Sequence, residues 1–375
     1  MKLSIQRETL LKPLQFAASI ADRRPTLPVL GNVLLEVTED QLMIVGSDGE
    51  IELKGVLALV EPAEVGAITV PARKFLDICR SLPDNSMVEI ELMQPQQESR
   101  KSGLQLQIRS GRSKFLLATL PAVEFPITPE VTATGEVEIQ QNILGDLIKQ
   151  THFAMAQQDV RHYLNGVLLE LAPSQVNMVA TDGHRLAISS VALNVDHHAQ
   201  VIIPRKAVLE LLKLLSDSDV PVKLVLSATQ LRMVSAEYVL TTKIIDSKFP
   251  DYQRVIPRNS DKEIVLDRDV LKQALMRAGI LANEKNRGVR LGLRPNSLHV
   301  TAHNPEQEEA QEELEIAYSG KALEIGFNVG YLIDVLNTVA PGKVTLSLSN
   351  DSTSALLEGV NVNTSAVYVI MPMRI

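Results

Sequence analysis

The chain has 375 residues, of which 45% are hydrophobic and 22% are charged, and its formal net charge at pH 7 is −8. This length exceeds what one ordinary hydrophobic core supports, and the composition excludes an intrinsically disordered chain. We therefore expect a globular protein of two or three domains.

The N-terminal segment MKLSIQRETLLKPLQ carries charges at short intervals, so it lacks the apolar core of a signal peptide. The sequence also lacks an apolar run of the ~18 residues that a membrane-spanning helix needs. The single cysteine, Cys79, cannot form an internal disulfide or a zinc cluster, and its apolar helical surroundings favour a core residue over a nucleophile. We expect a cytoplasmic protein without a membrane anchor, a metal ion or a cofactor.

Hydrophobic periodicity predicts six helices. In chain order they span residues 8–20, 72–81, 142–156, 205–215, 269–282 and 328–339. Pro71 and Pro204 precede two of them, a position that suits a helix start. Short β-branched runs lie between the helices, and the order helix, strand pair, helix, strands occurs three times. The predicted fold class is α+β, with three repeated domains that each pack two helices on an antiparallel sheet.

The repeats are also visible as sequence motifs that recur along the chain. LGNVLLEV at 30–37 returns as LNGVLLEL at 164–171, and the same offset carries GSDGE at 46–50 onto ATDGH at 180–184. Asp-Gly between apolar runs predicts a β-hairpin in each copy. A fainter third copy begins with NRGVRLGL at 286–293. One structural plan is therefore used three times.

Two polar, proline-containing segments separate the copies. They read EFPITPEVTATGE and KFPDYQRVIPRNSDKE, and segments of this kind commonly link separately cored domains. We predict an N-terminal domain at 1–128, a central domain at 129–254 and a C-terminal domain at 255–375.

The most enzyme-like pair in the chain is Asp182 with His184, which could serve as an acid-base couple or bind a metal. In the first repeat Asp48 and Glu50 occupy the equivalent positions, so the turn is retained and the histidine is not. The common phosphate-binding, metalloprotease and hydrolase motifs are missing from the sequence. A non-enzymatic function is favoured, and an enzyme centred on His184 is the alternative.

Charge is distributed unevenly along the chain. A basic run, RKSGLQLQIRSGRSK, lies in the first repeat and an acidic run, NPEQEEAQEELE, lies in the third. Each could be an ordinary solvated face, but together they could orient a head-to-tail contact between copies of the chain. The predicted helices carry more basic than acidic residues, as expected for helices that face a polyanion, although amphipathic helices alone could give this pattern.

Seven segments, in this order, carry a resemblance that extends from the first residue to the last: RRPTLPVLGN, VPARKFLDICRSLP, MAQQDVRHYLNG, ATDGHRLA, KFPDYQRV, NPEQEEA and VIMPMRI. Together they closely resemble the bacterial DNA polymerase III beta subunits, the replicative sliding clamps. The resemblance implies the DNA clamp fold in a head-to-tail homodimeric ring of six like domains, with helices lining the hole. It also implies a protein that is not an enzyme and that tethers the polymerase to DNA.

The resemblance implies a set of partners as well. They are double-stranded DNA bound without sequence specificity, a second copy of the chain, the polymerase III catalytic subunit, the clamp-loader complex, and other polymerases and repair proteins with clamp-binding peptides. Domain size agrees with such a ring, because a domain of about 125 residues is roughly 36 Å across. Three touching spheres of that size leave a hole of only about 6 Å, whereas six leave about 36 Å, enough for a duplex whose major groove alone is about 12 Å wide.

The resemblance assigns residues to three sites. DNA contact is implied at Arg24, Arg73, Gln158, His162 and Tyr163. The family commonly has tyrosine at the position of His162, and strand packing is an equal alternative for Tyr163. A partner-peptide pocket is implied at Leu164, Thr181, Gly183, His184, Arg185, Leu186, Pro250, Arg254, Val255, Val369, Met371, Pro372, Met373 and Arg374. The dimer contact is expected at Arg109, Arg112, Lys114, Phe115, Ile280, Leu281, Glu308, Glu309 and Glu312.

Overall fold

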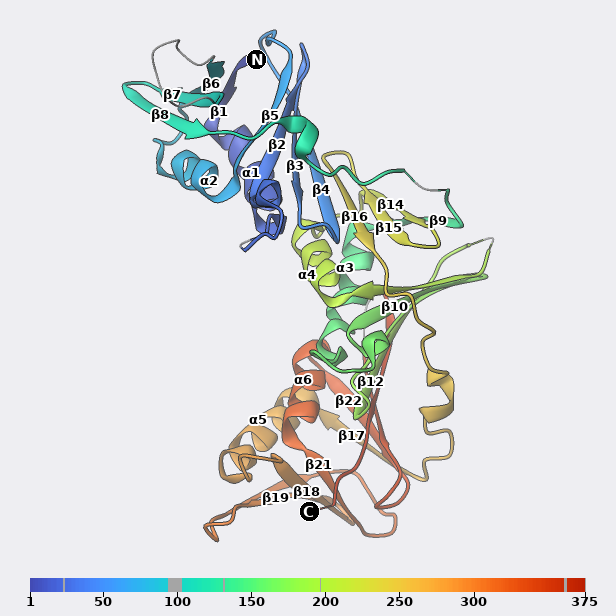
Figure 1. Cartoon of the computed structure of the whole chain (residues 1–375). Helices are drawn as coiled ribbons and strands as arrows, with labels where there is room; N and C mark the ends of the chain where they lie inside the picture. The colour runs from blue at the N-terminus through green and yellow to red at the C-terminus, as the bar shows by residue number, and fades with distance from the viewer. Residues whose placement is uncertain (23, 94–102, 131, 196, 361–362, 375) are drawn as a thin grey trace. The chain divides into compact units, whose positions relative to one another are not determined.

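The computed structural model describes residues 1–22, 24–93, 103–130, 132–195, 197–360 and 363–374. The chain forms two compact units (Figure 1). Unit 1 contains Met1–Ile139 and Pro221–Lys243, and unit 2 contains Gln140–Val220 and Ile244–Ile375. The segment assigned to the middle repeat therefore contributes to both units.

Unit 1 contains the helices α1 (Arg7–Ile20) and α2 (Ala72–Ser81) and two antiparallel sheets. The smaller sheet has the order β1 (Lys2–Gln6), β6 (Met87–Met93), β7 (Gln105–Ser110) and β8 (Ser113–Ala118). The larger sheet has the order β5 (Gly66–Pro71), β2 (Asn32–Val37), β3 (Gln41–Ser47), β4 (Ile51–Ala58), β16 (Tyr238–Lys243), β15 (Gln230–Val234), β14 (Pro221–Leu226) and β9 (Gly135–Gln140). Helix α1 packs against α2, β3 and β4.

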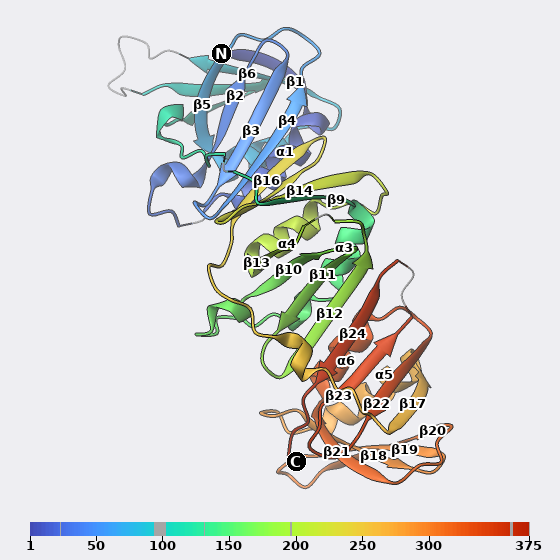
Figure 2. The same ribbon diagram turned by 90° about the vertical axis from the view of Figure 1, so that its right-hand side faces the viewer.

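Unit 2 contains α3 (Gln141–Lys149), α4 (Arg205–Leu214), α5 (Arg268–Ala278) and α6 (Val329–Thr338). Its larger sheet, seen in Figure 2, has the order β13 (Ala199–Pro204), β10 (Gly166–Ala172), β11 (Gln175–Thr181), β12 (Arg185–Ala192), β24 (Ser365–Ile370), β23 (Ala355–Gly359), β22 (Lys343–Leu348) and β17 (Lys262–Asp267). Its smaller sheet has the order β20 (Glu309–Glu315), β19 (Ser297–His303), β18 (Gly288–Arg294) and β21 (Leu323–Asn328). Helices α3 and α4 pack on β10 to β13.

Each large sheet combines strands from two repeats. In unit 1, β4 of the first repeat pairs with β16 of the second, with Glu52 opposite Thr241. In unit 2, β12 of the second repeat pairs with β24 of the third, with Leu186 opposite Val369. Backbone hydrogen bonds therefore cross the repeat boundaries, which explains why the two compact units do not coincide with the three repeats.

All six predicted helices are present, but two of the predicted ends are wrong. The helix predicted at 142–156 ends at Lys149, and a 3₁₀ turn follows at His152–Ala154. The hydroxyl of Thr151 donates to the carbonyl oxygen of Leu147, which satisfies a backbone acceptor at the helix end. The helix predicted at 269–282 likewise changes from α to 3₁₀ geometry after Ala278.

The two predicted Asp-Gly hairpins are confirmed. Gly49 and Gly183 have φ angles of 86° and 89°, a conformation that glycine adopts without steric cost. In the first turn Asp48 Oδ1 accepts from the backbone N–H of Ile51, and in the second Asp182 Oδ1 accepts from that of Arg185. The aspartates are therefore retained because they close the turns.

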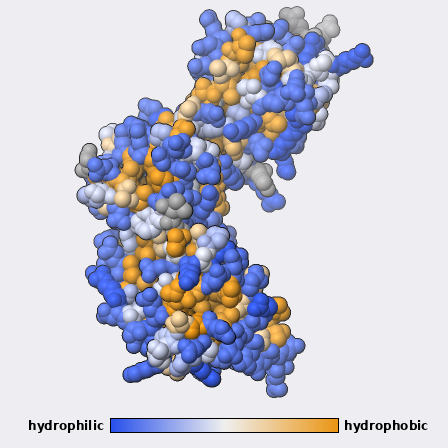
Figure 3. Space-filling view, turned by 180° about the vertical axis from the view of Figure 1, so that it is seen from behind, coloured by the Kyte–Doolittle hydropathy of each residue, from blue (hydrophilic) through white to orange (hydrophobic). Residues whose placement is uncertain are grey.

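Hydrophobic side chains fill the space between helices and sheets in unit 1. Leu10 and Leu14 of α1 and Phe75 and Cys79 of α2 are fully buried in one cluster. Burial raises the pKa of the Cys79 thiol to about 12, as expected of a core cysteine. Figure 3 shows a mostly hydrophilic face on which apolar residues gather in patches. Among the described residues, no helix is both long enough and apolar enough to cross a bilayer.

A buried carboxylate holds the segment that follows the first repeat. The side chain of Glu52 is 1% exposed, and its Oε1 lies 3.1 Å from Lys54 Nζ. Its Oε2 accepts a hydrogen bond of 2.7 Å from the backbone N–H of Thr128. Charge pairing and a backbone donor together compensate for the desolvation of this carboxylate.

Replacing Glu52 by alanine is expected to lower the free energy of unfolding by about 2 kcal/mol, because Lys54 and the Thr128 N–H lose their partner. The matched control is Glu50→Ala, which removes an exposed ion pair with Lys243 and should change stability by less than about 1 kcal/mol. Urea unfolding of both variants measures the difference. Equal stabilities would contradict the role given to Glu52.

Candidate functional site

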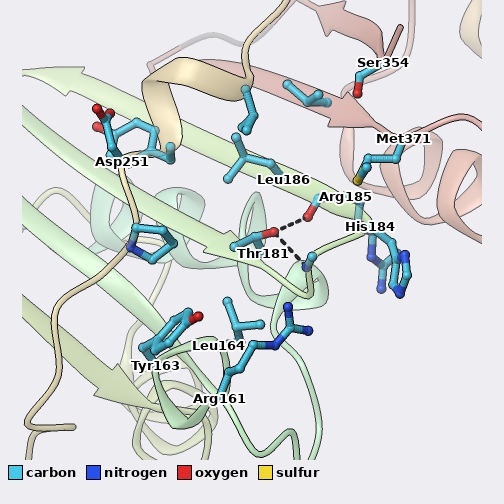
Figure 4. Close-up of a pocket in the computed structure, with 15 residues that line it drawn as sticks. Arg161, Tyr163, Leu164, Thr181, His184, Arg185, Leu186, Asp251, Ser354 and Met371 are labelled. Carbon is cyan, nitrogen blue, oxygen red and sulfur yellow. Dashed lines mark hydrogen bonds between the residues drawn. The ribbon is translucent and has the colours of Figure 1, made fainter. Parts of the chain in front are cut away.

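A cavity of about 290 Å³ lies in unit 2, on the large sheet and under the segment that leads out of the second repeat. In Figure 4, Tyr163 and Leu164 lie on one side of it, Ser354 and Met371 on the opposite side, and Leu186 between them. We call this cavity the pocket. It is lined by Arg161, Tyr163, Leu164, Thr181, Gly183, His184, Arg185, Leu186, Pro250, Asp251, Tyr252, Val255, Ser354, Val369 and Met371.

Strand alternation produces the apolar floor of the pocket. Ser189 of β12 donates a hydrogen bond to Gln150, just after α3, so the side chains of Leu186 and Ile188 point to the opposite face of the sheet. Leu186 pairs with Val369 across β12 and β24, and both are almost completely buried. The pocket therefore offers a hydrophobic surface on the face of the sheet that the helices leave free.

The Asp-Gly turn forms one wall. The hydroxyl of Thr181 donates to the carbonyl oxygen of Arg185 at 2.6 Å and accepts from the N–H of Gly183 at 3.0 Å. The carbonyl oxygen of His184 accepts a hydrogen bond from the backbone N–H of Met371. This bond keeps the chain after β24 beside the turn, so that Met371, whose side chain is half exposed, reaches the rim.

The side chain of Arg185 holds the Asp-Gly turn in place through several contacts. Its guanidinium group donates to Asp182, to Asp334 of α6 and to the carbonyl oxygen of Phe153. It also lies 5.1 Å from the ring centre of Phe153 and 4.6 Å from that of Tyr331. Because its donors are occupied by these groups, the arrangement fixes the shape of the wall.

The opposite wall is the 3₁₀ turn η5 (Tyr252–Val255). The hydroxyl of Tyr252 donates to Glu170 Oε2 at 2.7 Å, and burial raises the pKa of this tyrosine. Burial also raises the pKa of Glu170, but the hydrogen bonds from Tyr252, Asn177 and Gln200 outweigh it and leave that pKa below its ordinary value. A buried, ionised glutamate therefore anchors the turn to the sheet.

Arg161 lines the pocket, and its side chain is about half exposed at the pocket's opening. Its guanidinium group pairs with Asp159 at 2.9 Å. The hydrogen bonds from the side chain and the backbone of Arg161 lower the pKa of Asp159 to about 2. The cation is therefore held in place at the opening of the apolar cavity.

The enzyme alternative gains no support from this geometry. Asp182 accepts from the backbone of its own turn and from Arg185, whereas the ring of His184 stacks on Tyr331 with 6.3 Å between ring centres. Within the described part of the chain, no cluster of three or more His, Cys, Asp or Glu residues could hold a metal ion. The site offers an apolar cavity and not an acid-base couple.

The structure gathers most of the predicted pocket residues around this cavity: Leu164, Thr181, Gly183, His184, Arg185, Leu186, Pro250, Val255, Val369 and Met371. Arg254, Pro372, Met373 and Arg374 are not among the residues that line it. Arg161, Tyr163, Asp251, Tyr252 and Ser354 line it and were not assigned to it from the sequence. The first four lie within the segments MAQQDVRHYLNG and KFPDYQRV, so the family resemblance could have assigned them to the pocket. Ser354 lies outside every segment that carries the resemblance.

The residues predicted to contact DNA lie in both units. In unit 1, Arg73 is exposed on the first turn of α2 and lines a polar cavity of about 480 Å³ with Arg80 and Asp77, and Arg24 is exposed shortly after α1. In unit 2, Gln158 and His162 are exposed in the segment between α3 and β10. Tyr163 is partly buried and packs against the cluster that contains Leu168 and Phe249.

The residues predicted for the dimer contact lie on or beside two edge strands and in a 3₁₀ turn at Gly279–Leu281. In unit 1, Arg109, Arg112 and Lys114 are exposed, and Phe115 is partly buried in β8, the last strand of its sheet.

In unit 2, β20 is the last strand of its sheet, and Glu308 and Glu309 are exposed at its start. Glu312 accepts two hydrogen bonds from Arg277 of α5, at 2.8 and 2.6 Å, so part of the acidic charge is already compensated. Ile280 is exposed next to the partly buried Leu281.

The equivalent place in the first repeat has the same framework with different side chains. Glu52 and Thr241 pair in unit 1 where Leu186 and Val369 pair in unit 2. The backbone N–H of Lys243 donates to the carbonyl oxygen of Glu50, just as that of Met371 donates to His184. The repeated frame therefore carries a buried, paired carboxylate in unit 1 and the apolar floor of the pocket in unit 2.

Comparison with known proteins shows similarity over the whole chain. Models of the DNA polymerase III beta subunit match its N-terminal domain to residues 1–129, its central domain to residues 138–251 and its C-terminal domain to residues 253–374. Two curated relatives, the beta sliding clamps of Pseudomonas putida and Escherichia coli, are 48% and 45% identical over 100% of both chains. A crystal structure of the sliding clamp of Pseudomonas aeruginosa bound to griselimycin has a TM-score of 0.95 and 47% identity over 100% of both chains.

Replacing Glu170 by glutamine should change the pH dependence of stability. Because the folded-state pKa lies below the ordinary value of 4.5, the ionised carboxylate stabilises the fold fully above that pH, and this contribution is lost as the pH falls through the folded pKa. The stability difference between wild type and Glu170→Gln should therefore shrink below pH 4.5. Denaturant unfolding between pH 7 and 3 measures it, with Glu36→Gln, an exposed residue at the equivalent position, as control. A constant difference across this range would be evidence against the anchor.

Proposed function

The chain belongs to the DNA polymerase III beta subunit family and acts as the DNA sliding clamp of that polymerase, and we propose that it does so as a head-to-tail ring of two copies whose pocket binds partner peptides. The observation that carries this proposal is the match of three family domains, in order, to residues 1–129, 138–251 and 253–374. We accordingly propose three clamp domains close to the boundaries at 128 and 254. A ring of two copies then contains six such domains.

A clamp must hold DNA topologically and still move along it. Hydrogen bonds to base edges would fix it at one sequence, so we propose a few contacts to phosphates instead. Arg24 and Arg73, both exposed, supply positive charge, and Gln158, His162 and Tyr163 supply polar contacts. These local cations allow a chain with a net charge of −8 to accept a polyanion.

We propose that the ring closes where β8 of one copy meets β20 of the next. Each is an edge strand with one neighbour among the described residues, so its free backbone groups can pair with another chain. Lys114 lies on the β8 edge, Arg112 lies in the turn before it, and Arg109 lies opposite Lys114 on β7. These cations face Glu308 and Glu309 at the start of β20, and the opposite charges select the head-to-tail arrangement. Phe115, Ile280 and Leu281 supply the apolar part of this contact, and Glu312 takes part while bound to Arg277.

We propose that the pocket takes the apolar side chains of short peptides from partner proteins. Burial of one leucine-sized side chain on Leu186 and Val369 is worth about 2 kcal/mol, and Met371 adapts to different shapes. Arg254, Pro372, Met373 and Arg374, which lie outside the lining, would contact the residues that flank this anchor. The expected partners are the catalytic subunit, the clamp loader, other polymerases and repair proteins. The chain itself performs no catalysis, needs no cofactor and works in the cytoplasm.

A ring held by topology should stay on closed DNA and leave open DNA. We expect protein loaded on a nicked circular plasmid to be retained during gel filtration in high salt and to be released when the plasmid is cut once. The measurement is the fraction that co-elutes with DNA before and after cutting. Equal loss from circular and linear DNA would contradict the ring.

Met371→Asp should weaken binding to the polymerase III catalytic subunit by at least about ten-fold, because a charge is placed at the rim of the apolar pocket. The Met371 side chain is half exposed, so the fold should tolerate the change. Val123→Asp, at an exposed position in unit 1, is the matched control and should bind as wild type does. Surface plasmon resonance measures both affinities, and an unchanged value for Met371→Asp would remove the pocket from the proposal.

A further inference from the structure

A second cavity, of about 330 Å³, lies beside the pocket in unit 2. We call it the outer groove. Its lining includes Asn177 of β11, Ser190 of β12, Glu358 of β23 and Val367 of β24, together with Tyr252 and Arg258 from the segment after the second repeat. Tyr252 lines both cavities, so the outer groove begins where the pocket ends.

Sheet register places the floors of the two cavities next to each other on the same two strands. Leu186 and Val369 form a cross-strand pair in the floor of the pocket. Two residues further along, Ile188 pairs with Val367, and both line the outer groove. Residues two apart on a strand project from the same face, so one apolar track runs beneath the η5 turn.

The outer groove contains a hydrogen-bond acceptor without a donor. Asn177 is 8% exposed, and its Nδ2 donates to Glu170 Oε2 at 3.0 Å. The ionised carboxylate can only accept, which fixes the amide so that Oδ1 points away from it. Among the described residues, Asn177 Oδ1 has no hydrogen-bond partner. A buried acceptor without a donor costs free energy, and a ligand that brings an N–H group would recover it.

The rim of the outer groove is polar and carries one positively and one negatively charged side chain. Arg258 and Glu358 are exposed, and Gln175 and Gln253 add amide groups. An extended peptide matches this chemistry, because its backbone supplies N–H donors and its side chains alternate between the apolar track and the polar rim.

We propose that the outer groove binds the segment of the partner peptide that continues from the residues held in the pocket. This inference rests on the proposed function of the pocket. The occupant is an extended chain that passes over Tyr252, lays an apolar side chain on Ile188 and Val367, and brings N–H donors toward Asn177. The partner is therefore recognised by more residues than the pocket alone can hold.

Cross-linking from single cysteines tests this directly. Cys79, the chain's own cysteine, is buried with a raised thiol pKa, so an introduced cysteine reacts selectively with a maleimide. Glu358→Cys places a benzophenone-maleimide at the rim of the outer groove, Met371→Cys places it at the pocket, and Val123→Cys places it at a remote site. Each labelled protein is mixed with the polymerase III catalytic subunit, irradiated and analysed by mass spectrometry.

We expect positions 358 and 371 to capture neighbouring residues of one segment of the catalytic subunit, and position 123 to capture none of that segment. Capture at 371 without capture at 358 would overturn the outer groove and leave the pocket intact. Capture at 358 of a second copy of the chain, or of a distant part of the catalytic subunit, would also overturn it. If neither position captures the catalytic subunit, the proposed function of the pocket fails and the inference fails with it.

A blocking variant gives a second measurement. Ser190→Arg fills the outer groove from β12 and should weaken binding of the catalytic subunit by about ten-fold, the change that corresponds to about 1.4 kcal/mol. Val123→Arg is the control of equal charge and should leave the affinity unchanged. A wild-type affinity for Ser190→Arg, with its unfolding curve unchanged, would contradict the proposal.

Discussion

The pairing of β12 with β24 is the interaction on which the site depends. These strands belong to different repeats, and their backbone hydrogen bonds make one sheet of the second repeat and the third. The register places Leu186 beside Val369 and brings Met371 to the turn at His184. A shift by one residue would turn the apolar floor toward the helices, so the pocket exists only in this register.

The repeated plan also explains why the two large sheets differ in chemistry. The turns at Asp48 and Asp182 are closed by the same hydrogen bonds, and a strand from the following repeat is added beside each. What differs are the side chains that the frame presents. In unit 1 the frame carries Glu52, which uses its charge to hold the segment at Thr128, whereas in unit 2 it carries Leu186 and leaves an open apolar surface. The two units therefore share one backbone frame, and the side chains on its outer face make the site.

Local features could be predicted from the sequence because they depend on neighbouring residues. The Asp-Gly turns and the existence of six helices follow from turn chemistry and periodicity, and most of the pocket lies in segments that were recognisable by resemblance. Helix α3 ends earlier than its periodicity predicts. The hydroxyl of Thr151 donates to the carbonyl oxygen of Leu147, whereas the backbone N–H of Thr151 donates to that of Ile148. Ser354 and the contact between Tyr252 and Glu170 were missed because strand pairing between distant segments creates them. No sequence motif indicated Asn177. Among the described residues its Oδ1 lacks a partner because Glu170, which is adjacent in the sheet, holds the amide by its Nδ2.

The central claim is that two copies of a three-repeat chain close into one ring. Electron microscopy of the purified protein, without DNA, tests this most directly. The account predicts closed particles of two chains with six lobes around a central hole wide enough for a DNA duplex. Particles of a single chain, open chains of several copies, or closed rings of three copies would contradict it.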